Sequence, residues 1–417
     1  MSFNLPSDVQ FIIDRLFTEG YRADVVGGPV RDFLMGRVPH DYDITTSASP
    51  DEVKRVFDGY RTVDTGIKHG TVTLVLNGEN YEITTYRIDG EYRDSRRPES
   101  VTFTTELTED LARRDFTMNA IAYNDRDGVT DPWGGREDIA ARTIRAVREP
   151  HLRFNEDALR ILRALRFAST LGFAVEEATR VAIFDTKDLL LNISSERIYS
   201  ELYKLLSGDG AELIFTDYRE VISVFLPELA GVCDLSGAFF YPDPETRLAA
   251  LFYIALGEAA SDAYSSAMRR LHTDAKTRSD GALALARVAK YDTSTELGVL
   301  RLLSDAGFSA ARLALRIEVS AGIRDESALR ILDRLVSHRA PYRPADLDLN
   351  GNDLIEIGIT GAAIGRTMRV LLEQVMSRRL ENRREALLTA AQRLYPVATD
   401  SDEGIATTEE KLPKKSY

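Results

Sequence analysis

Two aspartates separated by one residue, Asp41 and Asp43, follow a glycine pair, Gly27 and Gly28, near the start of the chain. On a strand the side-chain period is two, so both carboxylates would point to the same side. Neighbouring carboxylates repel each other unless a cation lies between them, and hard oxygen ligands suit Mg²⁺. A glycine turn has no Cβ atoms to keep phosphates away from the backbone. Together these residues could hold a metal ion and bind phosphates, as nucleotidyl transfer requires.

The elements around these residues should form a small mixed sheet with helices packed on it. Val25 and Val26 predict the end of a strand, and Pro29 suits the first turn of a helix that stops at Gly36. Two later β-rich runs, Thr71 to Leu76 and Tyr81 to Tyr86, predict a hairpin. Glu82, in the second run, is either a third carboxylate of a metal site or a solvent-facing residue of an edge strand. Both interpretations stay open on pattern alone.

Adjacent arginines and a charged segment follow the hairpin. Arg113 and Arg114 suit a triphosphate as well as they suit a solvated surface. The stretch from Asp89 to Glu99 is polar and without periodicity, which predicts a mobile loop.

From about residue 146 the pattern becomes helical. Within the segment from Glu156 to Phe167, Asp157, Arg160 and Arg163 recur every three residues and are expected to share a helix face. A solvated charged stripe is the usual explanation of such a pattern. Residues 207–340 predict further helices with few chemical signals. The region from Asn352 to Leu394 predicts a last helical part with a concentration of arginines, and the composition after Val397 predicts disorder.

Length and composition limit the class of protein. A chain of 417 residues predicts two to four domains, and 44% hydrophobic with 29% charged residues is ordinary for a soluble globular protein. No apolar run reaches the roughly 20 residues that cross a bilayer, and the N-terminus lacks a secretion or transit signal. Cys233 is the single cysteine, so a cytoplasmic protein is expected. The net charge of −13 argues against a general nucleic-acid binder but allows a local basic groove.

Five segments resemble the class II tRNA nucleotidyltransferase and poly(A) polymerase family. They are Gly27-Gly28-x-x-Arg31-Asp32 with Asp41-x-Asp43, Arg113-Arg114-Asp115-Phe116-Thr117, Asp131-Pro132-x-Gly134-Gly135, Glu156-Asp157-x-x-Arg160 with Arg163 and Arg166, and Glu196-Arg197-Ile198 with Glu201-Leu202. Each is weak alone, but five in the family's order and approximate spacing are specific. They cover residues 25–206, about half of the chain. A weaker likeness, Gly361-x-x-Ile364-Gly365 with Leu380-Glu381-Asn382, points to the compact bacterial CCA-adding members.

The resemblance implies an α+β protein with a head, neck, body and tail. The head, 1–145, would be a nucleotidyltransferase domain of the polymerase-β type, with a mixed sheet and helices. All-α parts would follow as a neck (146–206), a body (207–340) and a tail (341–397), with 398–417 disordered.

The resemblance also implies roles for the residues. Asp41 and Asp43 would be catalytic and hold Mg²⁺, with Glu82 as a candidate third ligand. The triphosphate would be bound by Gly27, Gly28, Arg31, Arg113 and Arg114, and the base by Asp157, Arg160, Arg163 and Arg166. Candidate tRNA-binding residues in the tail are Arg366, Arg378, Arg379, Arg383 and Arg384, although a solvated helix paired with glutamates explains them as well.

The base-reading role has a chemical reason beyond the likeness. A carboxylate accepts a hydrogen bond from an exocyclic amine, and a guanidinium donates to a ring nitrogen. Cytosine and adenine each offer an amine beside a ring acceptor, whereas uracil and guanine present the opposite pattern. Asp157 and Arg160 can therefore select C and A, which makes the solvated stripe the weaker interpretation. A mismatched base would leave buried partners unpaired at about 1–3 kcal/mol each.

The implied activity is the addition of C, C and A to the 3′ end of tRNA from CTP and ATP, without a nucleic-acid template and with release of pyrophosphate. Alternatives within the family are an enzyme that adds only CC or only A, and a poly(A) polymerase. By comparison with the family, the charged segment from Asp89 to Glu99 is not shortened, which favours complete addition. A non-catalytic RNA-binding protein is the rival from another class, and the intact carboxylates argue against it. No protein partner and no membrane association are expected.

Overall fold

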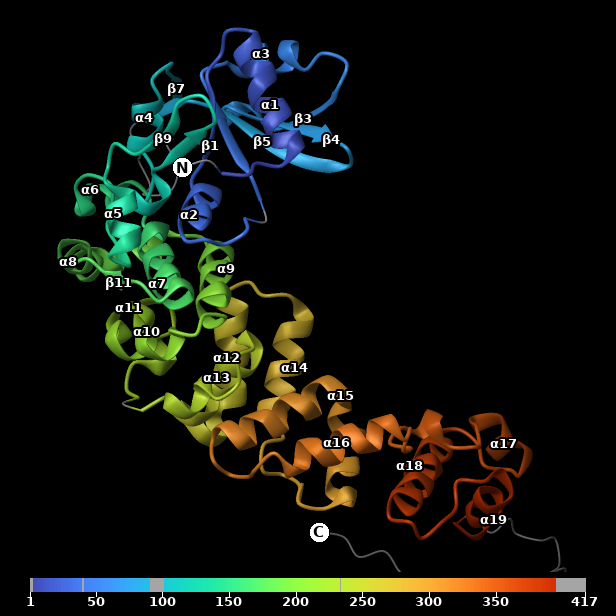
Figure 1. Cartoon of the computed structure of the whole chain (residues 1–417). Helices are drawn as coiled ribbons and strands as arrows, with labels where there is room; N and C mark the ends of the chain where they lie inside the picture. The colour runs from blue at the N-terminus through green and yellow to red at the C-terminus, as the bar shows by residue number, and fades with distance from the viewer. Residues whose placement is uncertain (1–2, 40, 91–100, 233, 395–417) are drawn as a thin grey trace, which may run out of the picture. The chain divides into compact units, whose positions relative to one another are not determined.

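The computed structural model describes residues 3–39, 41–90, 101–232 and 234–394 (Figure 1). The chain forms two compact units. The first comprises Met1–Ala286 and Arg316–Ile323, and the second comprises Arg287–Leu315 and Arg324–Tyr417. Among the described residues, no helix is long and apolar enough to cross a membrane. The predicted disordered segment, 398–417, and most of the predicted loop between Asp89 and Glu99 lie outside the described residues.

A seven-stranded mixed sheet organises the N-terminal part of the first unit, in the order β3-β4-β5-β2-β1-β8-β9. Only β2 and β5 pair in parallel among these neighbours. The strands are β1 (Ala23–Val26), β2 (Asp43–Thr46), β3 (Arg61–Gly66), β4 (Thr71–Leu76), β5 (Glu79–Thr85), β8 (Ala122–Asn124) and β9 (Gly128–Thr130). All four residues of β1 are buried, as expected of a central strand. The predicted mixed sheet is confirmed.

The predicted hairpin is present with a shorter turn than expected. β4 and β5 pair antiparallel, with Leu76 opposite Glu79. Asn77 and Gly78 both have positive φ, 54° and 90°. This is the backbone of a two-residue turn that matches the twist of its strands, and Asn-Gly is the sequence that favours it.

Short helices and one small sheet complete the head. The helices are α1 (Ser7–Thr18), α2 (Gly28–Leu34), α3 (Pro50–Val56), α4 (Leu107–Ala112) and α5 (Gly135–Ala140), with a 3₁₀ turn, η2 (Thr117–Asn119). β6 (Arg87–Asp89) and β7 (Val101–Phe103) form a two-stranded antiparallel sheet. Figure 1 shows α1 and α3 beside the blue sheet strands and α4 near β7.

A buried cluster packs α4 against β1 and β8. Val26, Leu111 and Ala122 belong to it, with Tyr86, Leu107, Ala120 and Val147, and Trp133 packs against its rim. The third sequence motif closes over the second at Gly135, where a Cβ would lie 2.2 Å from the carbonyl oxygen of Thr117. The glycine is therefore required by close backbone packing.

The remainder of the first unit is mostly helical. Its helices are α6 (Pro150–Glu156), α7 (Leu159–Leu171), α8 (Glu177–Thr186), α9 (Ser195–Leu206), α10 (Ala211–Asp217), α11 (Arg219–Phe225), α12 (Pro244–Leu256), α13 (Ala260–Arg270) and α14 (Ala275–Leu285). Strand content continues slightly past residue 146, because β10 (Thr143–Ile144) pairs in parallel with β11 (Ala174–Val175). The expectation of an all-α neck misses this two-residue strand.

The second unit is also helical. Its helices are α16 (Ser327–Ser337), α17 (Gly351–Glu356), α18 (Ala362–Met376) and α19 (Arg384–Leu394). α15 (Glu296–Ser320), which contributes residues to both units, is interrupted at Gly307, where φ is 72°. The helices of the predicted tail therefore fall within the second unit.

Candidate functional site

The strand β1 ends at the glycine turn, which is a tight connection into α2. Gly27 has φ 79° and ψ −127°, a conformation that only glycine adopts readily. Its N–H donates to the carbonyl of Ile121 at 3.1 Å. A Cβ at Gly27 would lie 3.1 Å from Nη1 of Arg114, so the turn leaves room for a guanidinium against the backbone.

The sheet register brings Asp43 to the same edge as the glycine turn. Val25 pairs with Ile44 in the antiparallel β1–β2 ladder, so the end of β1 and the start of β2 are neighbours. The expectation that Asp41 and Asp43 share a strand is wrong in one respect, because β2 begins at Asp43 and Asp41 precedes it. Both aspartates are exposed to solvent.

Asp43 has a raised pKa although solvent reaches it. Desolvation by the surrounding protein is the largest cause, the positive charge of Arg114 opposes it, and the negative charge of Asp41 raises the pKa further. Asp41 and Arg114 therefore both lie close enough to Asp43 to affect its pKa.

The donor set fits a hard divalent cation. Mg²⁺ is commonly held by one or two carboxylates, with water and substrate phosphates as its other ligands. Glu82, either a third metal ligand or a solvent-facing residue on pattern alone, pairs with Asp43 across β2–β5 and is exposed. Its strand is not an edge strand, because β5 lies between β4 and β2. Within the described ranges, no group of three or more His, Cys, Asp or Glu side chains is placed to hold a metal. A metal-binding role of Glu82 stays a prediction.

The two adjacent arginines share one buried carboxylate, Asp110, on α4. Arg113 donates to its Oδ1 from Nε at 3.0 Å and from Nη2 at 2.6 Å, and Arg114 donates to its Oδ2 at 3.3 Å. Burial alone would raise the pKa of Asp110, but the two arginines hold it below its usual range. Nε of Arg114 is buried and has no hydrogen-bond partner among the described residues.

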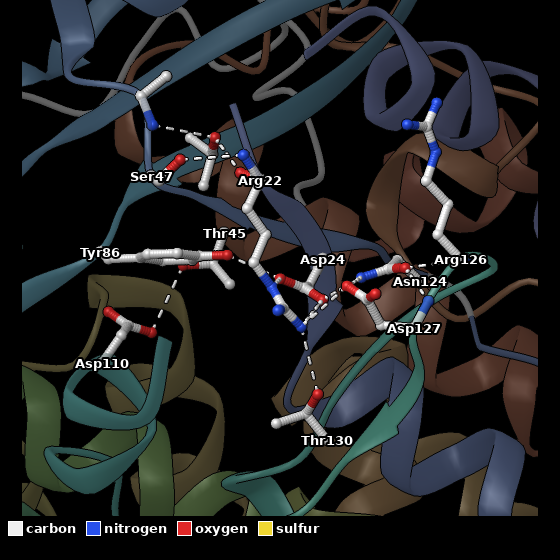
Figure 2. Close-up of polar contacts among 12 residues, drawn as sticks. Arg22, Asp24, Thr45, Ser47, Tyr86, Asp110, Asn124, Arg126, Asp127 and Thr130 are labelled. Atoms are coloured by element: carbon white, nitrogen blue, oxygen red, sulfur yellow. Dashed lines mark hydrogen bonds and ion pairs between the residues drawn. The ribbon is translucent and has the colours of Figure 1, made fainter. Parts of the chain in front are cut away.

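A second buried carboxylate, Asp24 on β1, has a separate set of partners (Figure 2). It accepts hydrogen bonds from the Tyr86 hydroxyl at 2.7 Å, from Nδ2 of Asn124 at 2.6 Å and from Nε of Arg22 at 3.1 Å. These contacts join β1 to Tyr86, to Asn124 on β8 and to Arg22. None of the three partners is Arg113 or Arg114.

Arg31, predicted to bind the triphosphate, is only 9% exposed. Its Nε and Nη2 donate to Oδ1 of Asp32 at 3.0 and 2.8 Å, and its Nη1 donates to Oδ1 of Asn119 at 2.8 Å. In this structure Arg31 connects α2 to η2 through its hydrogen bond to Asn119. A direct contact to phosphate would require some of these bonds to break.

Asn119 continues a chain of contacts from the head into the neck. Its Nδ2 donates to Oδ1 of Asp115 at 3.0 Å, and Arg163 on α7 donates to Oδ2 of Asp115 at 2.8 and 2.5 Å. Burial alone would raise the pKa of Asp115, but Arg163 and these hydrogen bonds hold it well below its usual range. Arg163 therefore links the neck to the second motif.

The expectation that Asp157 and Arg160 lie on one continuous helix is wrong. α6 ends at Glu156, Asp157 is extended with φ −139° and ψ 102°, and α7 begins at Leu159. Oδ2 of Asp157 accepts a hydrogen bond from Nη2 of Arg197 on α9 at 2.9 Å. The fourth and fifth motifs are thus in direct contact.

Arg160 is buried, and it connects α7 to α6 and to the arginine motif. Its Nη1 donates to Oε2 of Glu156 at 2.6 Å and to the Arg153 carbonyl at 2.9 Å, and its Nη2 donates to the Arg113 carbonyl at 2.8 Å. The two predicted base-reading residues are therefore near each other in sequence and fixed by different partners.

Arg166, the last predicted nucleotide-binding residue, makes its contacts within the neck. Its Nε lies 2.6 Å from Oε2 of Glu201 on α9, and its guanidinium carbon lies 3.8 Å from the centre of the Phe167 ring. These contacts give Arg166 a packing role between α7 and α9.

In the second unit the candidate tRNA-binding arginines divide into two groups. Arg378 pairs with Glu296, Arg383 with Glu381, and Arg384 with Asp353. For Arg366 and Arg379 the described residues provide no ion-pair partner. Arg379 lines a cavity of about 410 Å³ with residues such as Leu335 and Met376, all within this unit.

Three residues of this arrangement carry no role in the sequence interpretation. They are Asp110, Asn119 and Arg197. Asp110 has a signal in the sequence, because it stands three and four residues before the arginine pair, the spacing of neighbours on a helix. Arg197 stands in the fifth motif, but neither Arg197 nor Asn119 has a local spacing that indicates its partner, since Asp157 and Arg31 are distant in sequence.

Comparison with known proteins agrees with this geometry. Residues 23–145 match the family described as the poly A polymerase head domain, and residues 172–232 match the probable RNA and SrmB-binding site of polymerase A. A CCA-adding enzyme of Lactobacillus helveticus is 39% identical over 392 residues, which cover 90% of this chain and 94% of that enzyme. The chain belongs to the CCA-adding enzyme family.

Other members of the CCA-adding enzyme family support the same assignment. The enzyme of Bacillus velezensis is 37% identical over 383 residues, covering 89% of this chain and 94% of its own. The crystal structure of the Bacillus stearothermophilus CCA-adding enzyme in complex with CTP superposes with a TM-score of 0.78 at 32% identity, covering 94% of this chain and 98% of that one. The predicted nucleotidyltransferase family and head fold are confirmed, and CCA-adding enzymes of this family generally use a divalent metal.

Proposed function

We propose that this chain adds C, C and A to the 3′ end of tRNA, using CTP and ATP. The oxygen of the RNA 3′-hydroxyl forms a bond to the α-phosphorus of the nucleotide and loses its proton. The bond between the α-phosphorus and the oxygen that bridges it to the β-phosphorus breaks, and pyrophosphate leaves. The observation that carries the proposal is the meeting of Asp43, the Gly27 turn and Arg114 at one edge of the sheet. The single cysteine is consistent with a cytoplasmic location, which we also propose.

We assign the carboxylates of Asp41 and Asp43 to a metal site and propose Mg²⁺ as the ion. When bound, Mg²⁺ would stabilise negative charge on phosphate oxygens and lower the pKa of a coordinated hydroxyl. Both side chains are open to solvent, as an incoming substrate requires. Desolvation, and after it the negative charge of Asp41, raises the pKa of Asp43, and a bound cation would offset both effects.

For the triphosphate, Arg114 is the better placed of the two arginines. It lies beside Gly27, it acts on the charge of Asp43, and its Nε is without a hydrogen bond among the described residues. Gly27 and Gly28 would contribute the open backbone, and Arg113 would support its neighbour. Since guanidinium groups bind phosphate oxygens well, the pair provides a binding site at the edge of the sheet.

For the base, Asp157 would accept the amine of C or A and Arg160 would donate to the ring nitrogen. Arg163 would hold α7 against the second motif through Asp115. In this structure Asp157 is bonded to Arg197, and Arg160 is bonded to Glu156. Base binding therefore exchanges some of these contacts for contacts with the nucleotide.

The decisive experiment supplies tRNA that lacks its 3′ end with each labelled nucleotide and Mg²⁺. We expect two CMP additions, then one AMP addition that requires the preceding CC, and no run-on. CMP addition alone or AMP addition alone would indicate a partial enzyme, and long A tracts on many RNAs would indicate a poly(A) polymerase, the activity named in the matching head-domain family. Binding of tRNA without any incorporation would indicate a non-catalytic RNA-binding protein.

A further inference from the structure

Asp110 lies next to the candidate site and contacts three parts of the head. It is 0% exposed on α4. Besides the two arginines, its Oδ1 accepts the backbone N–H of Arg87 at 3.3 Å. Its Oδ2 accepts the hydroxyl of Thr45 at 3.4 Å (Figure 2). Both carboxylate oxygens therefore accept more than one donor.

The identity of these partners gives Asp110 a particular geometric role. Thr45 belongs to β2, two residues after Asp43. Arg113 and Arg114 follow α4 directly, three and four residues after Asp110. One carboxylate therefore fixes the arginine pair relative to the strand that carries Asp43.

The charges of Asp110 and the two arginines support the same geometric role. The side chains of Arg113 and Arg114 are only 17% and 19% exposed, so two positive charges lie side by side with little water. Like charges at this spacing repel, and a buried charge requires a partner. Asp110 compensates one of the two charges, which leaves a net positive charge for an anionic ligand.

The two arginines use Asp110 differently. Arg113 makes two hydrogen bonds to one oxygen, whereas Arg114 makes a single longer contact. Arg114 is also the one that approaches Gly27. The carboxylate thus anchors Arg113 firmly and leaves Arg114 directed toward the glycine turn.

We propose that Asp110 is a positioning residue for nucleotide binding, which holds Arg113 and Arg114 so that Arg114 meets the triphosphate beside Gly27 and Asp43. This inference rests on the proposed function. Because CTP, ATP and pyrophosphate share their phosphates, Asp110 should affect all three and leave the recognition of the base and of tRNA unchanged.

The test is the steady-state kinetics of Asp110→Asn on tRNA lacking its 3′ end. Asparagine keeps the size but loses the charge that orients the arginines. We expect KM for CTP and for ATP to rise together by about tenfold, the order expected for a lost hydrogen bond to a charged group. The inhibition constant of pyrophosphate should rise by a similar factor, and KM for tRNA should stay the same.

Asp24→Asn is the matched control. Asp24 is also 0% exposed and hydrogen-bonded to three side chains, none of which is Arg113 or Arg114. This variant should lower the melting temperature and leave KM for both nucleotides unchanged. If Asp110→Asn behaves like Asp24→Asn, with a lower melting temperature and unchanged nucleotide and pyrophosphate constants, the inference is overturned.

Thr45→Val provides a milder variant if Asp110→Asn does not fold. Valine keeps the shape and removes the hydroxyl, which lies 3.4 Å from Oδ2 of Asp110 and 3.2 Å from the Thr84 carbonyl oxygen. KM for CTP and ATP should rise together by about twofold. Unchanged KM values in a folded Thr45→Val would also count against the positioning role. Failure of the proposed function would look different, since the unaltered protein would then incorporate neither CMP nor AMP.

Discussion

Arg197 on α9 donates a hydrogen bond from Nη2 to Oδ2 of Asp157 at 2.9 Å, across 40 residues of chain. The other oxygen of Asp157, Oδ1, accepts the backbone N–H of Leu159 at 3.1 Å. The carboxylate that we propose to read the base is thus oriented from two sides. Nη1 of Arg197 is buried and has no hydrogen-bond partner within the described part of the chain.

We expect Arg197→Ala to weaken the discrimination against UTP and GTP. Without Arg197, Asp157 loses the contact that orients its carboxylate, so the acceptor for the base amine is less well placed. Loss of one hydrogen bond to a charged group predicts about a tenfold rise in misincorporation. Labelled UTP and GTP on tRNA lacking its 3′ end would measure it.

Arg180→Ala is the control for this variant. Arg180 forms an exposed pair with Glu177 on α8, so its removal should leave both stability and selectivity almost unchanged. Equal selectivity in the Arg197 and Arg180 variants would show that the pair with Asp157 does not orient the base reader.

Asp43→Asn should make the metal-free protein more stable while abolishing incorporation. Desolvation and Asp41 raise the pKa of Asp43, which means that its charged form is unfavourable in the folded protein. A neutral amide removes that cost. We expect a higher melting temperature for the variant in EDTA and a fall in kcat of about 100-fold or more with Mg²⁺.

Melting curves with and without Mg²⁺ test the same site without using activity. A ligand that binds only the folded state stabilises it, so Mg²⁺ should raise the melting temperature of the unaltered protein. The shift should be much smaller in Asp43→Asn. An identical shift in both proteins would mean that the ion binds elsewhere.

The raised pKa of Asp43 also predicts the direction of a pH effect. As the pH falls through this raised pKa, Asp43 takes up a proton in the folded state first, so its unfavourable charge is relieved and stability rises. Incorporation needs the carboxylate and should fall over the same range. Asp43→Asn should lack this contribution to the pH dependence of stability, which urea unfolding at several pH values would show.

Gly27→Ala should impair nucleotide binding more than stability alone explains. A Cβ there would lie 3.1 Å from Nη1 of Arg114 and would displace it. We expect a rise of several-fold in KM for CTP and ATP, measured in the same assay. The positive φ adds a backbone cost of roughly 1 kcal/mol.

Gly36→Ala separates these two effects. Gly36 has φ 72°, close to the 79° of Gly27, but a Cβ there would meet no atom within 4 Å. It should therefore lower the melting temperature by a similar amount and leave both KM values unchanged. A rise in KM for Gly36→Ala would assign the effect to backbone strain.

In the second unit we expect Arg366→Ala combined with Arg379→Ala to raise KM for tRNA and to reduce its salt dependence. These two arginines lack ion-pair partners among the described residues, so their charges are available to phosphates. Arg343→Ala is the control, because Arg343 pairs with Asp346. If all three substitutions leave KM for tRNA unchanged, the arginines of this region are a solvated surface.

Contiguous motifs were predictable from the sequence, whereas the partners of their residues were not. The strand, turn and helix around Gly27 follow from local rules, and the turn and helix lie where those rules place them. The pairing of Asp115 with Arg163 spans 48 residues, and no local pattern encodes it. The burial of Arg31 was missed for the same reason, since Asn119 lies 88 residues away.

The break at Asp157 was missed for a different reason. Residues spaced by three suit one long helix and also two short ones, so periodicity alone does not reveal the interruption. At the break, the Arg153 carbonyl accepts the N–H of Asp157, which is the last helical bond of α6, and also the side chain of Arg160. A side-chain contact of this kind has no periodic signature.

The break at Asp157 also affects the distance between the side chains of Asp157 and Arg160. If Asp157 were inside α7, the distance from its carboxylate to the Arg160 guanidinium would be set by the rigid rise of the helix. Asp157 is instead extended, and Ala158 joins it to the helix. A few backbone torsions therefore set the distance between the Asp157 carboxylate and the Arg160 guanidinium. We propose that the same two residues can thereby contact either a pyrimidine or a purine while α7 stays straight.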